Sequence, residues 1–175
     1  KYDILAEVSH EGAGEISGTG EFLYQSNTTL NVTENHGYTF VGWYVGETLY
    51  SSNKTIVFDS IDEDVSLIAK FEPITKTITY VSRVSAENNN LKTYDVRNGL
   101  FDLQDLSANG YKFNGWYTAQ NGGGDKIEQI NSMLLKDYIL YADWSVITYT
   151  ITYNLNGGTV SGINPIEYTI ETETF

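Results

Sequence analysis

The sequence predicts a mainly β (α+β) fold built of small tandem repeat modules, and three observations support this prediction. Residues 110–117 (GYKFNGWY) occur once more as residues 37–44 (GYTFVGWY), 73 positions earlier. Around both copies, apolar residues alternate with polar ones and many are β-branched, which is the pattern of half-buried strands. The same spacing relates two further pairs of segments, 67–71 to 140–144 and 74–80 to 147–153. Separated motifs that share one spacing indicate a tandem repeat.

The repeat divides the chain into three parts. We expect one module over residues 1–72, a second over residues 73–145, and an incomplete third over residues 146–175. Pro73 lies at the first boundary, where its missing N–H interrupts no sheet ladder. Each full module is near the lower size limit for a domain that folds by itself.

The first module is expected to contain strands only. Glycines between residues 11 and 20 indicate a turn after the first strand, and residues 35–37 turn the chain into the repeated motif. Strands are expected at residues 2–8, 21–24, 28–32, 37–44, 55–58 and 65–71.

The second module is less regular. Residues 98–109 fit either one or two helical turns or a short strand. Ile127, Ile130 and Leu134 have helical spacing, which predicts a short helix within residues 127–136. Strands are expected at residues 74–81, 91–96, 110–117 and 137–144.

The third part is predicted to be a β-hairpin. Its first strand alternates apolar and polar residues over 147–155, Asn156 and Gly157 form a favoured tight-turn pair, and residues 168–175 return. A lone hairpin is marginally stable in water. We therefore expect its order to depend on contacts with the second module or on self-association through its exposed strand edge.

In the repeated motif, a glycine lies between aromatic residues that a regular strand would place on opposite faces. In a regular strand Tyr111 and Phe113 point to one face and Trp116 to the other. A bulge at Gly115 would turn Trp116 toward the core, whereas an exposed Trp116 would form an aromatic platform on which a sugar could stack. The core interpretation is favoured. The signature residues are Gly37, Tyr38, Phe40, Gly42, Trp43, Tyr44 and Phe71 in the first module and Gly110, Tyr111, Phe113, Gly115, Trp116, Tyr117 and Trp144 in the second.

Composition excludes some functions. The formal net charge of −13 argues against nucleic acid as a partner, because such a protein needs a basic surface. The chain has no cysteine, which agrees with export without disulfides. No apolar run is long enough to cross a bilayer, so membrane insertion is not expected.

No pattern indicates catalysis or a cofactor. The two histidines, His10 and His36, accompany no nucleophile motif, so we expect no catalytic residue. The acidic residues between Asp59 and Asp64 could gather around Ca²⁺, but they lack EF-hand spacing and are better explained as a solvated connection. We therefore assign no metal and no cofactor.

These motifs together resemble the internalin-type B-repeat family, also called the Listeria–Bacteroides repeat. Its pattern is a threonine-rich strand, an Asn-Gly-Gly turn, the Gly-Tyr-x-Phe-x-Gly-Trp-Tyr motif and a closing Leu-Tyr-Ala-x-Trp, matched by residues 150–158, 110–119 and 140–144. The first module departs from it, since Phe71 replaces the final Trp. The resemblance implies β-grasp-like (ubiquitin-like) modules in a protein of the bacterial cell surface or cell wall, and the family has no catalytic residue set.

Two functions follow from this resemblance. The favoured one is a non-catalytic spacer or stalk that contributes to adhesion. The alternative is a module that binds a glycan or a host protein through a surface rich in tyrosine and tryptophan.

Overall fold

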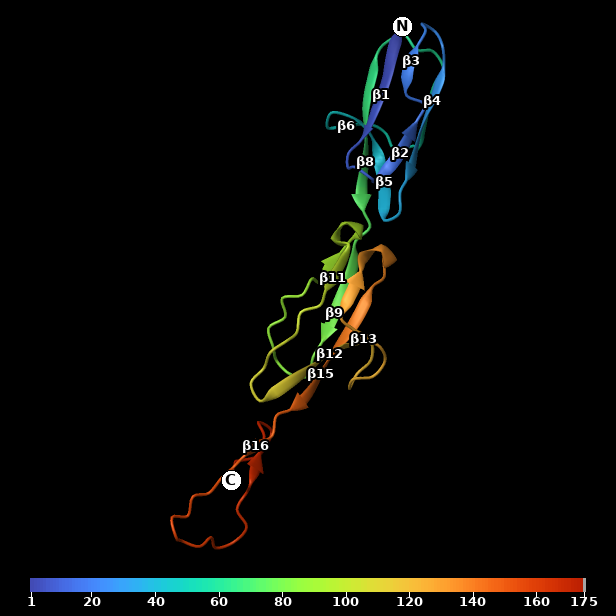
Figure 1. The fold of residues 1–175 in the computed structure, drawn as a ribbon. Helices are drawn as coiled ribbons and strands as arrows, with labels where there is room; N and C mark the ends of the chain where they lie inside the picture. Colours follow the sequence, from blue (N-terminus) through green and yellow to red (C-terminus); the bar gives the residue numbers. More distant parts are fainter. Residues whose placement is uncertain (175) are drawn as a thin grey trace. The chain divides into compact units, whose positions relative to one another are not determined.

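The computed structural model describes residues 1–174, and these form a mainly β protein (Figure 1). The described chain divides into two compact units. The first comprises Lys1–Lys76 together with two later segments, Tyr94–Gly99 and Ser132–Leu135. The second unit comprises the remaining described residues.

The first unit is built on a five-stranded sheet in the order β3-β1-β8-β5-β6. Its neighbouring strands β1 and β8 run parallel, and its other pairs are antiparallel. A parallel pair needs a long crossover, and the intervening chain supplies it. The strands are β1 (Tyr2–Val8), β3 (Gly20–Phe22), β5 (Tyr38–Val45), β6 (Thr48–Ser51) and β8 (Val65–Pro73).

A second, three-stranded sheet lies within that crossover. It has the order β2-β4-β7 and is antiparallel. Its Leu30 and Val32 share one buried cluster with Trp43, Leu67 and Phe71 of the larger sheet. The two sheets thus enclose the core of the first unit. The strands are β2 (Gly14–Ser17), β4 (Thr28–Glu34) and β7 (Thr55–Phe58).

The later part of the chain repeats this plan. A five-stranded sheet has the order β10-β9-β15-β12-β13, and β9 and β15 are again the parallel pair. A two-stranded sheet pairs β11 with β14. The elements are β9 (Lys76–Val81), β10 (Thr93–Tyr94), the 3₁₀ turn η1 (Val96–Asn98), β11 (Leu100–Asp102), β12 (Tyr111–Tyr117), β13 (Lys126–Ile127), β14 (Gln129–Asn131), the 3₁₀ turn η2 (Ser132–Leu134) and β15 (Tyr138–Val146).

The helix predicted within residues 127–136 is wrong. Ile127 pairs with Trp116 across one sheet, while Ile130 pairs with Phe101 across another and is fully buried. Their three-residue spacing thus reflects two short strands that pair within different sheets. Only the 3₁₀ turn over Ser132–Leu134 has helical character. For residues 98–109, the structure contains the strand alternative, β11.

The last part of the chain has less regular structure than predicted. Its strands β16 (Tyr149–Thr150) and β17 (Glu167–Tyr168) pair antiparallel but are only two residues long each. Asn156 and Gly157 do form a turn with positive φ values of 43° and 89°. The predicted return strand does not extend beyond Tyr168 among the described residues, and Phe175 lies outside them.

Candidate functional site

The signature strand is bulged at the same place in both repeats. In the pairing of β5 with β8 the register shifts between Phe40 and Gly42, and in the pairing of β12 with β15 it shifts between Phe113 and Gly115. Gly115 has a φ of 134°, which side-chain-bearing residues rarely adopt. The extra residue reverses the alternation of side chains, so the following Trp faces the same way as the preceding Phe.

This bulge buries both signature tryptophans. Trp43 is 0% exposed and Trp116 is 2% exposed. Both lie against the motif's phenylalanine in an edge-to-face arrangement, with ring centroids 5.6 Å apart for Phe40–Trp43 and 5.4 Å for Phe113–Trp116. Such geometry is favourable for aromatic pairs. Neither Trp is available as an exposed platform.

The indole N–H groups of these tryptophans are satisfied within the fold. Trp43 Nε1 donates to the carbonyl oxygen of Asn53, and Trp116 Nε1 donates to that of Gln104, each at 3.0 Å. A buried donor without a partner would cost free energy, so these carbonyls fix the ring orientation as well as the burial.

The closing aromatic completes a trio in each repeat. Phe71 packs edge-on to Phe40 with centroids 5.6 Å apart, and Trp144 packs edge-on to Phe113 at 5.1 Å. The signature tyrosines keep part of their surface in solvent: Tyr38, Tyr44, Tyr111 and Tyr117. The signature glycines Gly37 and Gly110 precede the strands and have positive φ values of 85° and 77°.

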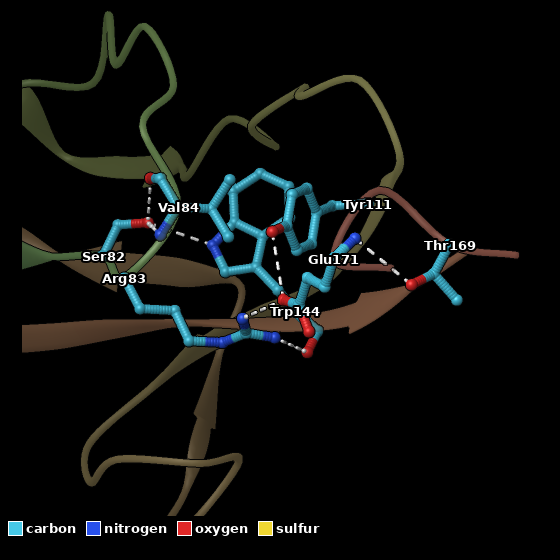
Figure 2. A network of polar contacts seen from close by, with 7 residues as sticks. All are labelled: Ser82, Arg83, Val84, Tyr111, Trp144, Thr169 and Glu171. Carbon is cyan, nitrogen blue, oxygen red and sulfur yellow. Dashed lines mark hydrogen bonds and ion pairs between the residues drawn. The ribbon is translucent and has the colours of Figure 1, made fainter. Parts of the chain in front are cut away.

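A polar network surrounds the closing Trp of the second repeat (Figure 2). Ser82 Oγ accepts from Trp144 Nε1 at 3.0 Å and from the Val84 N–H at 3.2 Å, and it donates to the Val84 carbonyl at 2.6 Å. One hydroxyl therefore holds the indole and closes the turn after β9.

The same network reaches residues near the chain's end. Arg83 Nη2 donates to the Trp144 carbonyl at 2.9 Å, and its Nη1 lies 3.3 Å from Glu171 Oε1. Tyr111 donates its hydroxyl proton to the same carboxylate at 3.0 Å, and this hydrogen bond raises the pKa of Tyr111. Figure 2 shows these side chains converging beside Trp144. The network is a structural contact between the signature strand and the segment after β17.

Sequence reasoning did not identify Arg83 or Glu171. The two residues are 88 positions apart, and no local pattern connects them. The sequence does hold one signal for another member of this network, because Ser82 corresponds to Ser9 at the repeat spacing of 73.

Each histidine lies within hydrogen-bonding distance of one neighbouring group. His10 Nδ1 lies 3.0 Å from Ser9 Oγ, and that oxygen accepts from the backbone N–H of Phe71. His36 Nε2 lies 2.8 Å from the Met133 carbonyl. Asp64 Oδ1 accepts from the Asp3 N–H at 2.8 Å, and within residues 1–174 no three His, Asp or Glu side chains converge on a point suited to a metal. None of the helical segments in that range is long and apolar enough to span a membrane.

Two successive β modules with the same bulged, aromatic-centred strand define the class of tandem-repeat β proteins. Two family models match the chain: the divergent InlB B-repeat domain over residues 4–75 and the Listeria–Bacteroides repeat domain over residues 77–143. The chain belongs to this internalin-type B-repeat family, with a divergent first repeat. Both models describe repeat domains, and neither describes an enzyme family.

Curated relatives are longer proteins. A putative Gly-rich membrane protein of Evansella cellulosilytica is 28% identical over 90% of this chain, and a putative membrane protein of the same organism is 28% identical over 71%. Internalin H of Listeria monocytogenes is 25% identical over 81% of the chain. The chain spans 19%, 18% and 24% of these relatives, respectively. No solved structure matches the chain.

Proposed function

We propose that this chain is a spacer, a non-catalytic series of β modules that belongs to a protein of the bacterial cell surface or cell wall and contributes to adhesion by positioning another part of that protein. The observation that carries this proposal is a hydrogen bond that recurs after each closing strand. The Ile74 N–H donates to the Gly37 carbonyl, and 73 residues later the Ile147 N–H donates to the Gly110 carbonyl, both at 2.8 Å. A connection that recurs at the repeat spacing is what a serial array of modules requires.

We also propose that each module is β-grasp-like. The parallel pairs β1–β8 and β9–β15, in which β8 and β15 each also pair antiparallel with a signature strand, support this assignment. In the β-grasp-like plan a helix fills the crossover, whereas here the β2-β4-β7 sheet occupies that place in the first unit. This small sheet supplies Leu30 and Val32 to the core, which is the role that a crossover helix would have.

The module boundaries at residues 72 and 145 are part of the same proposal. Residues 73–145 expressed alone should give dispersed amide NMR signals and a cooperative melt. We expect less order over Tyr94–Gly99 and Ser132–Leu135, because these segments belong to the first compact unit. A collapsed fragment with no cooperative transition would contradict the boundaries.

The spacer function can be tested on living cells. The full chain is inserted between a cell-wall anchor and a reporter domain of known ligand, beside two controls: no insert, and two unrelated β domains of similar size. A spacer should raise capture of a bulky immobilised ligand as much as the unrelated domains do. Cells that adhere to host surfaces through the chain itself, without the reporter's ligand, would contradict the spacer function and favour recognition.

The alternative function, binding of a glycan or host protein, is favoured by one observation. The rings of Tyr149 and Tyr168 stack with centroids 5.2 Å apart and an interplanar angle of 25°, and they are 38% and 41% exposed. An exposed ring pair can stack against a sugar face. A glycan array probed with the full chain tests this: a hit that is lost in Tyr149→Ala but kept in Tyr50→Ala, an exposed tyrosine elsewhere, would establish it.

A further inference from the structure

Each repeat has a four-residue turn directly after a short strand that lies beside its first strand. The turns are Leu23–Ser26 after β3, Asp95–Asn98 after β10 and Thr169–Thr172 after β17. In each, the backbone N–H of the fourth residue donates to the carbonyl of the first, at 3.0 to 3.1 Å. The turns therefore occupy equivalent positions in three successive repeats.

The second and third of these turns share a pattern of side-chain caps. In the second, Asp95 accepts from the Arg97 N–H at 2.9 Å, and Asn98 Oδ1 accepts from the Asp95 N–H at 2.9 Å. In the third, Thr169 and Thr172 take the same two positions, with distances of 3.2 and 2.8 Å. The two turns present their second residue, Val96 or Ile170, in the same way.

That second residue covers a signature glycine. Val96 lies so close to Gly37 that a Cβ atom there would overlap its side chain, and a Cβ at Gly110 would lie 2.6 Å from Ile170 Cβ. Both glycines also accept the recurring isoleucine N–H bond. Each pair lies inside one compact unit. The glycine before the signature strand is thus a socket, and the apolar turn residue packs over it, with 54% of Ile170 still exposed.

The first turn has no such socket within the described chain. It presents two large apolar residues, Leu23 and Tyr24, which are 66% and 61% exposed. Hydrogen bonds of 2.8 and 2.9 Å between Ile61 and the backbone of Gln25 and Ser26 hold the turn in place. The turn is ordered and apolar, yet its second residue, Tyr24, covers no glycine of the first unit.

We propose that the Leu23–Tyr24 turn is a docking surface for the signature turn of another B-repeat module, joined on the N-terminal side of Lys1. We infer a preceding module as the partner from the two observed cases, because in both the covered glycine lies in the repeat that precedes the turn in the chain. The matched part of this chain is at most 24% of each curated relative, and this length leaves room for such modules. This inference rests on the turns and not on the spacer function, since an array of ligand-binding repeats would use the same junction.

The absence of cysteine gives a direct test. In a fusion protein, residues 73–146 are placed directly before Lys1 of the full chain. Lys1 then follows residue 146, as Ile147 does in the native sequence. Tyr24→Cys is then labelled with a maleimide in the fusion and in the unfused chain. We expect its rate to fall several-fold in the fusion, toward the rate of Val96→Cys in the native chain. Leu100→Cys, at an exposed residue, is the control and should react equally in both proteins.

Equal Tyr24→Cys rates in the two proteins would overturn the proposal. The proposal would also be overturned if the labelling rate of Tyr24→Cys in the unfused chain fell as the protein concentration rose, because the surface would then bind a second copy of the chain. A graft gives a readout even if the added module does not fold. In it, Leu-Tyr-Gln-Ser replaces Asp95–Asn98 of the native chain. Retained hydrogen-exchange protection of the Ile74 N–H would show that the first turn fits the Gly37 socket, and lost protection would contradict the proposal.

Discussion

Trp144 Nε1 donates to Ser82 Oγ at 3.0 Å, and the serine at the corresponding position of the first repeat, Ser9, accepts from the backbone N–H of Phe71 at 3.1 Å. The two repeats keep the acceptor and change the donor. Where the closing residue is Phe71, it has no side-chain N–H, so the serine binds the backbone N–H of the same position instead. This explains how the first repeat diverges at its last aromatic without losing the serine contact.

Ser82→Ala should destabilise the second unit by about 1–2 kcal/mol, because it leaves the indole N–H of Trp144 and the Val84 N–H without their acceptor. Chemical denaturation monitored by near-UV circular dichroism measures this loss. Ser145→Ala removes an exposed hydroxyl of the same sheet and should have a much smaller effect.

A double-mutant cycle separates this hydrogen bond from general packing. Trp144→Phe removes the indole donor but keeps an aromatic ring, as Phe71 does in the first repeat. The double variant, which combines Trp144→Phe with Ser82→Ala, should lose less unfolding free energy than the sum of the two single losses, because both changes remove the same interaction. Strict additivity would mean that the serine and the indole do not interact.

Trp116→Ala should cost about 3–5 kcal/mol of unfolding free energy, the range for removing a large buried aromatic side chain. Trp116 is almost fully buried and touches the rings of Phe113 and Tyr80. A loss of this size could unfold so small a module, and thermal melts would show it. The exposed Leu100 supplies the control, since Leu100→Ala should change the melting temperature little.

The signature strand could be predicted in detail because a local conflict identified its geometry. In a regular strand Phe113 and Trp116 would lie on opposite faces, so Trp116 could reach the core only through a bulge at Gly115. The register shift lies there. The strand pattern of residues 74–81 was equally informative, since its alternation is long and regular.

Other parts could not be predicted because their cause is not local. Ile127 and Ile130 have the spacing of a helix, yet each pairs with a different partner strand, and those partners are known only from the fold. The Arg83–Glu171 contact joins residues far apart in sequence, and neither residue belongs to a motif. A pattern method detects periodic burial and misses single polar contacts of this kind.

Tyr80 should lose its phenolic proton at a higher pH than an ordinary tyrosine. Its ring is half-buried against Trp116 with centroids 4.7 Å apart, and this desolvation raises the pKa of Tyr80 to about 12, against 10.0 without the shift. The raised pKa stabilises the fold at and below pH 10, and this contribution is lost as the pH rises from about 10 to about 12. Ultraviolet titration of the native chain and of Tyr80→Phe should differ by one late-titrating tyrosine.

The same variant provides the stability readout. Tyr80→Phe should reduce the loss of unfolding free energy between pH 9 and pH 11 relative to the native chain, because the titrating group is gone. It also removes the hydroxyl that donates to the Leu91 carbonyl at 3.1 Å, so its stability at neutral pH should fall slightly. An unchanged slope between pH 9 and pH 11 would show that burial of Tyr80 does not control this range.

The order of the segment after β15 should depend on Ile170 more than on the ion pair beside it. Arg83 and Glu171 are each about half exposed, and exposed ion pairs contribute little to stability. Ile170 instead packs directly on Gly110, one residue before the signature strand. Its removal should therefore loosen the β16–β17 pair, which two-residue strands cannot stabilise alone. Hydrogen exchange at the Ile151 N–H, which donates to the Ile166 carbonyl at 2.8 Å, reports on this pair.

On a confirmed monomer, Ile170→Ser should greatly reduce protection at Ile151, while Arg83→Gln should reduce it only slightly. Ile163→Ser is the matched control, because it makes the same change at a fully exposed isoleucine of the same segment and should leave protection intact. Protection within β12 and β15 should persist in all three variants, since the core around Trp116 does not include the segment. If Ile151 stayed protected in Ile170→Ser, the pair would be stable without its contact to the signature turn, and the turn could not be what orders the segment.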